Sequence, residues 1–154
     1  MTVDLMTQLS DRLEISALIY RTARAMDTRD WTLLEACYLP EAIGDFATGE
    51  TVGFQPILRQ YQIFLTPLDV TQHLIGNVEC ILSGYQAVTR CLFQAQHVRS
   101  GVEGGEQFVI GGRYDDQVTR TPEGWRLARR RVTGLWTSGN RAVLGGTLRP
   151  PQVS

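Results

Sequence analysis

The stretch TQHLIGNVECIL, residues 71–82, decides the fold, because from here on the apolar residues follow a period of two instead of the helical period of 3.6. Three later segments follow the same period: 85–98, 106–120 and 125–136. Turn residues separate the four segments, at Ser83-Gly84, at 101–105 and at 122–124. A period of two bounded by such turns indicates strands. We therefore expect four long strands in an antiparallel meander.

The chain before residue 71 is predicted to be mostly helical. Residues 11–26 have apolar side chains at helical spacing, and Asp11 followed by Glu14 predicts a capping box at the start of this first helix. Asp30 is the expected cap of a second helix over residues 31–38, which Pro40 stops. A short strand over 42–47 and a turn over 48–53 come next. A third amphipathic helix is expected from Pro56 to Leu65.

Three helices followed by a long sheet predict an α+β fold, because the apolar face of the sheet needs a packing partner. We expect a cone-shaped α+β barrel, in which three N-terminal helices pack on a strongly curved, mainly antiparallel sheet. The 154 residues are predicted to form one domain with a core over about 10–136. The tail over 138–154, rich in Gly and Pro, is expected to be a lid, a subunit-contact arm or disordered.

The composition of the chain argues against several classes of partner and cofactor. The net charge of −1 makes nucleic acid an unfavourable partner, and with no long apolar run and no leader we expect a cytoplasmic protein without a membrane partner. All fifteen basic residues are arginine, which excludes Schiff-base and lysine-anchored cofactor chemistry. Cys37, Cys80 and Cys91 are widely spaced and are expected to be buried, reduced thiols. Two histidines without a third ligand predict neither a metal nor a cofactor.

Two histidines and one aspartate are the candidates for acid–base chemistry. His73 begins the first long strand, and His97 lies on the side of the next strand that also carries Phe93. Asp27 falls at the C-terminal end of the first helix, where the helix dipole disfavours a negative charge unless a cation compensates it, either a histidine that gains a proton or Arg24 one turn earlier. A His–Asp pair makes a general base at neutral pH, although the same pair is also a common structural ion pair.

The arginine run of residues 129–131 is the candidate for anion binding. Alternation along a strand sends Arg130 to the face opposite Arg129 and Arg131. Arginines on a strand are usually solvated, but one that faces a pocket stabilises an oxyanion or a leaving group.

Several motifs together resemble the SnoaL-like, scytalone dehydratase-like family of the nuclear transport factor 2-like (NTF2-like) superfamily. These motifs, in chain order, are DRLEI (11–15), AMDTRDW (25–31), DF (45–46), TQHLIGN (71–77), GGRY (111–114) and GWRL (124–127). The resemblance implies a cone around an apolar pocket, with Asp27 and His73 as its acid–base pair. It also matches Arg130 to an arginine near the leaving group of hexachlorocyclohexane dehydrochlorinase, and His97 to a second pocket histidine of scytalone dehydratase. Two tyrosines of the scytalone dehydratase motif are replaced here, by Met26 and Phe46.

We therefore predict a cofactor-independent lyase or isomerase of the dehydratase kind, acting on a mostly apolar small molecule such as a polyketide, steroid or terpenoid. The alternative is a domain of the same fold that binds a small ligand, or associates with other subunits, without catalysis. A homo-oligomer, trimer or dimer, is expected because Val88, Leu92, Val98 and Val109 would form an apolar patch on the outer sheet face. The residues expected to contact the substrate are Tyr20, Thr22, Met26, Trp31, Phe46, Phe93 and Tyr114.

Overall fold

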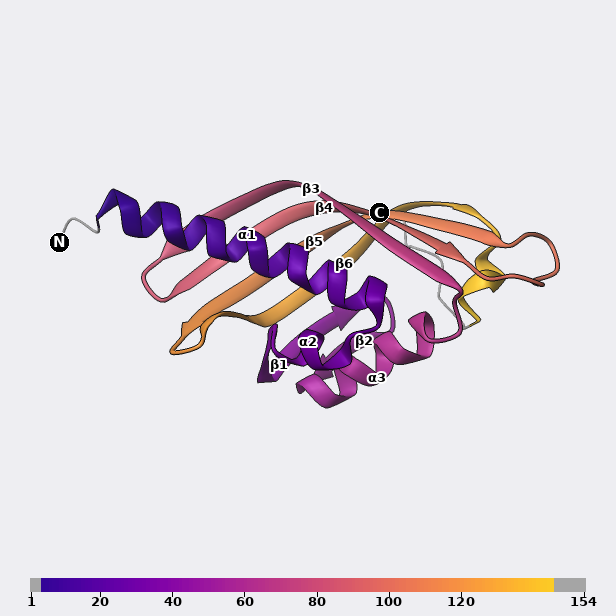
Figure 1. Cartoon of the computed structure of the whole chain (residues 1–154), viewed down its shortest axis with the longest axis horizontal. Helices are drawn as coiled ribbons and strands as arrows, with labels where there is room; N and C mark the ends of the chain where they lie inside the picture. Colours follow the sequence, from indigo (N-terminus) through magenta and orange to yellow (C-terminus); the bar gives the residue numbers. More distant parts are fainter. Residues whose placement is uncertain (1–3, 146–154) are drawn as a thin grey trace.

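Four long antiparallel strands form most of one sheet, as the period of two predicted. In the computed structural model, which describes residues 4–145, these strands are β3 (Val70–Ser83), β4 (Gln86–Val98), β5 (Gln107–Thr121) and β6 (Gly124–Gly139). Within residues 4–145 the sheet has six strands in the order β2-β1-β6-β5-β4-β3, and only β1 and β6 run parallel. Helix α1 lies along one side of the curved sheet, with α2 and α3 near its lower end (Figure 1). The predicted α+β class is confirmed.

Strand β1 (Tyr38–Phe46) is longer than expected and is followed by β2 (Gly49–Val52), where only a turn was predicted. The second helix, α2 (Trp31–Glu35), is correspondingly shorter, because Tyr38 already pairs with Leu127 of β6. The backbone N–H of Leu127 also donates to the Cys37 carbonyl at 2.8 Å. Pairing with β6 thus ends the helix earlier than the local helical preference of residues 31–38 alone would.

Helix α1 (Leu5–Thr28) begins earlier than predicted, at an N-cap formed by Asp4, whose side chain accepts from the Met6 backbone N–H at 3.2 Å. The predicted capping role of Asp11 is wrong. Asp11 is buried inside the helix, accepts from Trp125 Nε1 at 3.1 Å, and forms an ion pair with Arg120. A buried carboxylate needs such partners, so Asp11 connects the helix to β5 and β6.

The cap of α2 agrees with the prediction, since the Asp30 side chain accepts from the Leu33 backbone N–H at 2.9 Å. Helix α3 (Phe54–Leu65) starts two residues before Pro56, which lies in its first turn, where a missing N–H costs nothing. Arg29 joins the ends of α1 and α3, because its guanidinium donates to the carbonyls of Leu65 and Leu68.

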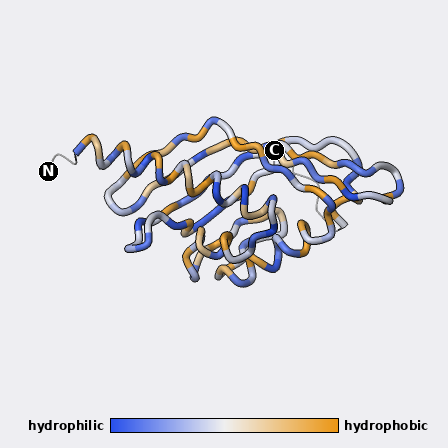
Figure 2. Tube along the Cα trace, in the orientation of Figure 1, coloured by the Kyte–Doolittle hydropathy of each residue, from blue (hydrophilic) through white to orange (hydrophobic). Residues whose placement is uncertain are grey.

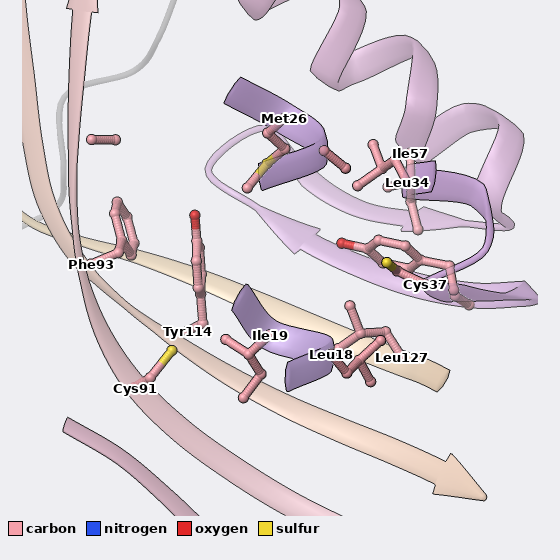
Figure 3. Close-up of a cluster of buried hydrophobic side chains, with 14 of the residues drawn as sticks. Leu18, Ile19, Met26, Leu34, Cys37, Ile57, Cys91, Phe93, Tyr114 and Leu127 are labelled. Carbon is pink, nitrogen blue, oxygen red and sulfur yellow. The ribbon is translucent and has the colours of Figure 1, made fainter. Parts of the chain in front are cut away.

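The core lies between the helices and the inner face of the sheet. Side chains along β4 alternate regularly between buried and exposed, and the chain trace alternates between hydrophobic and hydrophilic residues along the strands (Figure 2). Residues from α1, β1, β4, β5 and β6 meet in one hydrophobic cluster (Figure 3). Its members include Ile19 and Met26 of α1, Cys91 and Phe93 of β4, and Tyr114 of β5.

The outer face of the sheet carries the apolar side chains that the sequence placed there. Val88 and Leu92 are about half exposed, at 49% and 42%, while Val98 and Val109 are only partly buried. The three cysteines are free thiols; Cys37 and Cys91 are buried as expected, whereas Cys80 is only partly buried. Among residues 4–145, no helix is both long and apolar enough to cross a membrane.

The predicted tail over 138–154 begins in regular structure. Strand β6 continues to Gly139, and the short 3-10 helix η1 (Arg141–Leu144) follows it. Val143 and Leu144 are buried against the sheet, so this part is packed. Residues 146–154 lie outside the described residues, and the predictions for them stay predictions.

Candidate active site

A cavity of about 750 Å³ opens between α1, α3 and the inner face of the sheet. Most of its wall is apolar or aromatic, and the wall includes Met26, Phe46, Phe64, Phe93, Phe108 and Tyr114. The Phe93 and Tyr114 rings stack with their centroids 4.3 Å apart, and Figure 3 shows the Tyr114 hydroxyl directed toward Met26. Gly112 makes room for this stack, because a Cβ there would lie 2.5 Å from the Phe93 ring. Such a space suits a mostly apolar small molecule.

His73 and Asp27 are in direct contact at the edge of this cavity. His73 Nδ1 lies 2.6 Å from Asp27 Oδ1, and the His73 backbone N–H donates to both carboxylate oxygens at 3.1 and 3.0 Å. The His73 side chain lines the cavity and is only 6% exposed, whereas Asp27 is not part of the cavity wall. With Nδ1–H donating to a carboxylate, Nε2 is the nitrogen left to accept a proton.

The end of α1 explains why Asp27 reaches this position. Arg29 adopts a left-handed conformation with φ of 54°, and its backbone N–H closes the helix onto the carbonyls of Ala25 and Met26. The Arg29 side chain then holds this end against the last turn of α3. Two donors from His73 supply the local reason for a carboxylate at the unfavourable end of a helix dipole.

His97 is the second histidine in the cavity wall. Its ring centroid is 5.9 Å from that of His73, and its Nδ1 is 3.0 Å from Thr71 Oγ1. Burial, and to a smaller extent the nearby His73, lower the pKa of His97 to about 4. His97 is therefore a neutral imidazole at physiological pH, suited to donating a hydrogen bond rather than to carrying charge.

Arg130 does not reach the cavity, contrary to the role that its match to the dehydrochlorinase implied. It is 1% exposed and makes a two-bond ion pair with Asp116, with Nε at 2.9 Å and Nη2 at 2.7 Å from the carboxylate. Its guanidinium carbon lies 4.1 Å from the centre of the Tyr114 ring, behind the cavity wall. Burying a guanidinium requires a carboxylate beside it, and Asp116 on the neighbouring strand takes that place.

Four of the seven predicted substrate-contacting residues line the cavity: Met26, Phe46, Phe93 and Tyr114. The other three do not. Tyr20 is 50% exposed on the outer side of α1, Thr22 is buried and donates to the Leu18 carbonyl at 2.8 Å, and Trp31 packs partly buried against the core. Successive residues of a helix are about 100° apart around its axis, so Tyr20 points to solvent although the preceding Ile19 is buried.

The structure adds cavity residues that the sequence did not indicate. Tyr61 of α3 lines the wall, and its hydroxyl is 3.0 Å from that of Tyr38, whose pKa burial raises. Arg131 and Arg141 also line the cavity. The helical position of Tyr61 beside Leu58 and Leu65 on one face was the available signal for it, while Arg141 had none, because the tail lacked a period.

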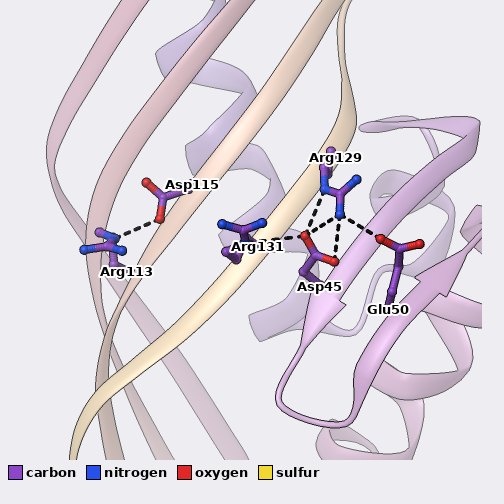
Figure 4. A network of polar contacts seen from close by, with 6 residues as sticks. All are labelled: Asp45, Glu50, Arg113, Asp115, Arg129 and Arg131. Atoms are coloured by element: carbon purple, nitrogen blue, oxygen red, sulfur yellow. Dashed lines mark hydrogen bonds and ion pairs between the residues drawn. The ribbon is translucent and has the colours of Figure 1, made fainter. Parts of the chain in front are cut away.

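The cavity mouth carries a network of charged residues. Arg129 donates to Asp45 at 2.8 and 2.9 Å and to Glu50 at 2.8 Å, and Arg131 lies 3.4 Å from Asp45 (Figure 4). A separate pair of Arg113 and Asp115 lies on β5. Opposite charges compensate each other at this edge of the cavity. Within residues 4–145, no three His, Cys, Asp or Glu side chains gather as a metal site would require.

Comparison with known proteins assigns the chain to a family. The model of the SnoaL-like domain matches residues 7–131, and the chain therefore belongs to the SnoaL-like family. An uncharacterised protein of Mycobacterium tuberculosis, Rv2910c, is 33% identical over 125 residues, which are 80% of this chain and 84% of the relative.

Solved structures share the fold closely. A "putative scytalone dehydratase" of Novosphingobium aromaticivorans superposes with a TM-score of 0.81 at 19% identity and covers 95% of both chains. A type 2 hexachlorocyclohexane dehydrochlorinase superposes with a TM-score of 0.78 at 18% identity, over 96% of this chain and 99% of that one. The relatives of this fold thus include proteins named as dehydratases and dehydrochlorinases, and also a "putative aromatic ring hydroxylase". At this level of identity they show the fold. The reaction has to be inferred from the residues of the site.

Proposed function

We propose that the protein is a cofactor-independent lyase or isomerase that removes a carbon-bound proton from a mostly apolar substrate. The observation that carries this proposal is the 2.6 Å contact between His73 Nδ1 and Asp27 Oδ1 at the wall of an apolar cavity. A histidine that merely filled its strand would not need a carboxylate on one ring nitrogen and a cavity beside the ring.

In the proposed first step, His73 Nε2 takes a proton from a carbon next to a carbonyl. The bonding electrons of that C–H bond move onto the carbonyl oxygen, which gives an enolate, and Asp27 stabilises the imidazolium that forms. A carbonyl or similar group is required, because an unactivated C–H bond is too weakly acidic for an imidazole base.

The enolate oxygen needs a hydrogen-bond donor, and His97 is the candidate. When Thr71 Oγ1–H donates to His97 Nδ1, the ring hydrogen of this neutral imidazole is on Nε2. A neutral imidazole then donates to the developing oxyanion without first losing a proton.

The enolate has two outcomes that balance without an added reactant. Expulsion of a β-hydroxyl, protonated by the His73 imidazolium, gives an enone and water. Return of the same proton to a different carbon gives an isomer. In both cases His73 ends as it began, so no cofactor is consumed.

The alternative function is binding without turnover, and the position of Arg130 favours it. The guanidinium that would neutralise a leaving group is held by Asp116 behind the wall, so this site has one polarising group fewer than the matched motif implied. A carrier of apolar molecules would need only the cavity.

A proton-exchange assay separates the two functions. The protein is incubated in D₂O with a panel of apolar ketones and β-hydroxyketones, and NMR follows deuterium at the α carbon and the appearance of enone. We expect exchange or elimination by the wild type and loss of it in His73→Gln. Saturable binding of several panel members with no exchange above the buffer rate would support the carrier instead.

A further inference from the structure

Arg141 lines the cavity wall and has no acidic partner among the residues that the structure describes. The other lining arginine, Arg131, lies 3.4 Å from Asp45 and is 61% exposed on its side chain. Arg141 makes no ion pair within residues 4–145, and its contacts there are the Thr137 hydroxyl at 3.4 Å and the face of Phe108. The carboxylates of the cavity mouth, Asp45 and Glu50, are already bound by Arg129.

The local structure holds Arg141 in place rather than leaving it on a free strand end. The preceding Asn140 accepts from the Ala142 backbone N–H at 3.1 Å and donates to the carbonyls of Glu103 and Gly105 at 2.9 and 2.7 Å. Val143 and Leu144, which follow in the same short helix as Arg141, are 0% and 3% exposed. The Arg141 guanidinium carbon lies 5.6 Å from the centre of the Phe108 ring. A guanidinium with fixed neighbours loses little freedom when it binds an anion.

We propose that Arg141 anchors a carboxylate of the substrate, so that the substrate is an apolar acid rather than a neutral molecule. This inference rests on the proposed function only in assuming that His73 and Arg141 serve the same bound molecule. One guanidinium neutralises one charge and matches a carboxylate with two parallel hydrogen bonds. A phosphate monoester brings nearly two charges, and the apolar wall around Phe108 and Leu144 offers nothing for the second.

The sheet register gives the spacing between the two ends of this substrate. His73 on β3 pairs with Ala95, and the adjacent inward residue His97 on β4 pairs with Phe108 on β5, over which Arg141 lies. Two strand spacings separate β3 from β5, which is about 10 Å. The carboxylate and the carbon that gives up its proton are thus at opposite ends of a rigid apolar body of one to two rings. His97 lies between them, where a carbonyl oxygen next to the reacting carbon would reach it.

Equilibrium binding of a matched pair of probes tests the anchor without turnover. The dissociation constants of 2-naphthoate and of the neutral 2-naphthamide are measured by ligand-observed NMR at neutral pH and low salt. We expect the wild type to prefer the acid by about tenfold or more, which is the usual effect of a charge-assisted hydrogen bond away from bulk water. Arg141→Gln should remove this preference by weakening the acid alone.

Two further variants make the outcome specific. Arg131→Gln should retain the preference, because its guanidinium is exposed and already faces Asp45. His73→Gln should also retain it, so a failure of the proposed base would not resemble a failure of the anchor. Equal affinity for acid and amide in the wild type, saturable binding of neither probe, or loss of the preference in Arg131→Gln instead of Arg141→Gln would each overturn the proposal.

Discussion

The buried pair of Arg130 and Asp116 gives the sharpest prediction about stability. Their side chains are 1% and 0% exposed, and two hydrogen bonds of 2.9 and 2.7 Å join them. Arg130 Nη1 is buried with no hydrogen-bond partner in residues 4–145, so the guanidinium depends on Asp116 alone for charge compensation. Asp116→Asn removes that compensation and leaves a buried cation.

The expected cost follows from this geometry. Breaking a buried ion pair by removing one partner costs about 3–5 kcal/mol, out of a total of about 5–15 kcal/mol for a domain. For a chain of about 150 residues, each kcal/mol lowers the melting temperature by about 2–4 °C, so Asp116→Asn should lower it by roughly 6–20 °C. Replacing both residues, as in Asp116→Leu with Arg130→Met, should recover much of the loss, because it removes both buried charges.

Thermal and urea unfolding, followed by circular dichroism, measure this cost. Asp115→Asn is the matched control: Asp115 is on the same strand, but its partners Arg90 and Arg113 have side chains that are 58% and 33% exposed, so a much smaller change is expected. If Asp116→Asn unfolded at the wild-type temperature, or if Arg130→Met kept its stability but lost activity, the structural role assigned to this pair would be wrong.

Three further predictions concern the rest of the chain. Burial holds the pKa of His97 near 4, below its ordinary 6.5, so the unfolded chain binds more protons between these values and stability should fall as the pH drops from about 6.5 to 4. This loss of stability is at most about 3 kcal/mol, and His97→Gln should reduce it. Unfolding curves at pH 4.5 and 7 for the wild type and His97→Gln measure the difference. If the variant lost as much stability between these pH values as the wild type, His97 would not be a buried neutral imidazole. The half-exposed Val88 and Leu92 on the outer face predict a homo-oligomer, and a light-scattering mass of one 17.2 kDa chain at micromolar concentration would contradict it. Activity should be the same with and without EDTA, and a loss restored by a divalent cation would refute a metal-free site.

Most of the fold follows from local patterns in the sequence. The four long strands were predictable because the inner residues Cys91, Phe93 and Ala95 alternate with outward ones along a period of two. The end of α2 was not predictable from local patterns, because β1 forms by pairing with β6, which is about ninety residues away in the chain. Asp11 was misread for a similar reason: a carboxylate before a helical run has the pattern of a cap, and only the folded chain places Trp125 and Arg120 beside it.

In the candidate site, too, some residues were predictable from the sequence and others were not. The contact of Asp27 with His73 was predicted from the position of each residue at the end of its own element together with the family resemblance, and the structure contains it. Alternation placed Arg130 on the face opposite Arg129 and Arg131. The sequence could not show that a register shift between Leu127 and Arg129 turns Arg130 inward, or that Asp116 on β5 would bind it and keep it behind Tyr114. Arg141 escaped prediction because its position depends on the cap formed by Asn140 and the burial of Leu144, neither of which has a periodic signature.

The most direct test of the account measures exchange rate and melting temperature together on His73→Ala, Asp27→Asn and the double variant. If the two residues act as one base, each single substitution should lower the rate of α-proton exchange by about 10² to 10⁴. The double variant should be little slower than the slower single one, because residues acting as a unit are strongly non-additive. All three should retain most of the folded-state stability, because Asn at position 27 can still accept from the His73 backbone N–H and the His73 side chain faces the cavity. Lower melting temperatures with an unchanged rate per folded molecule would contradict the account and make this contact a structural ion pair.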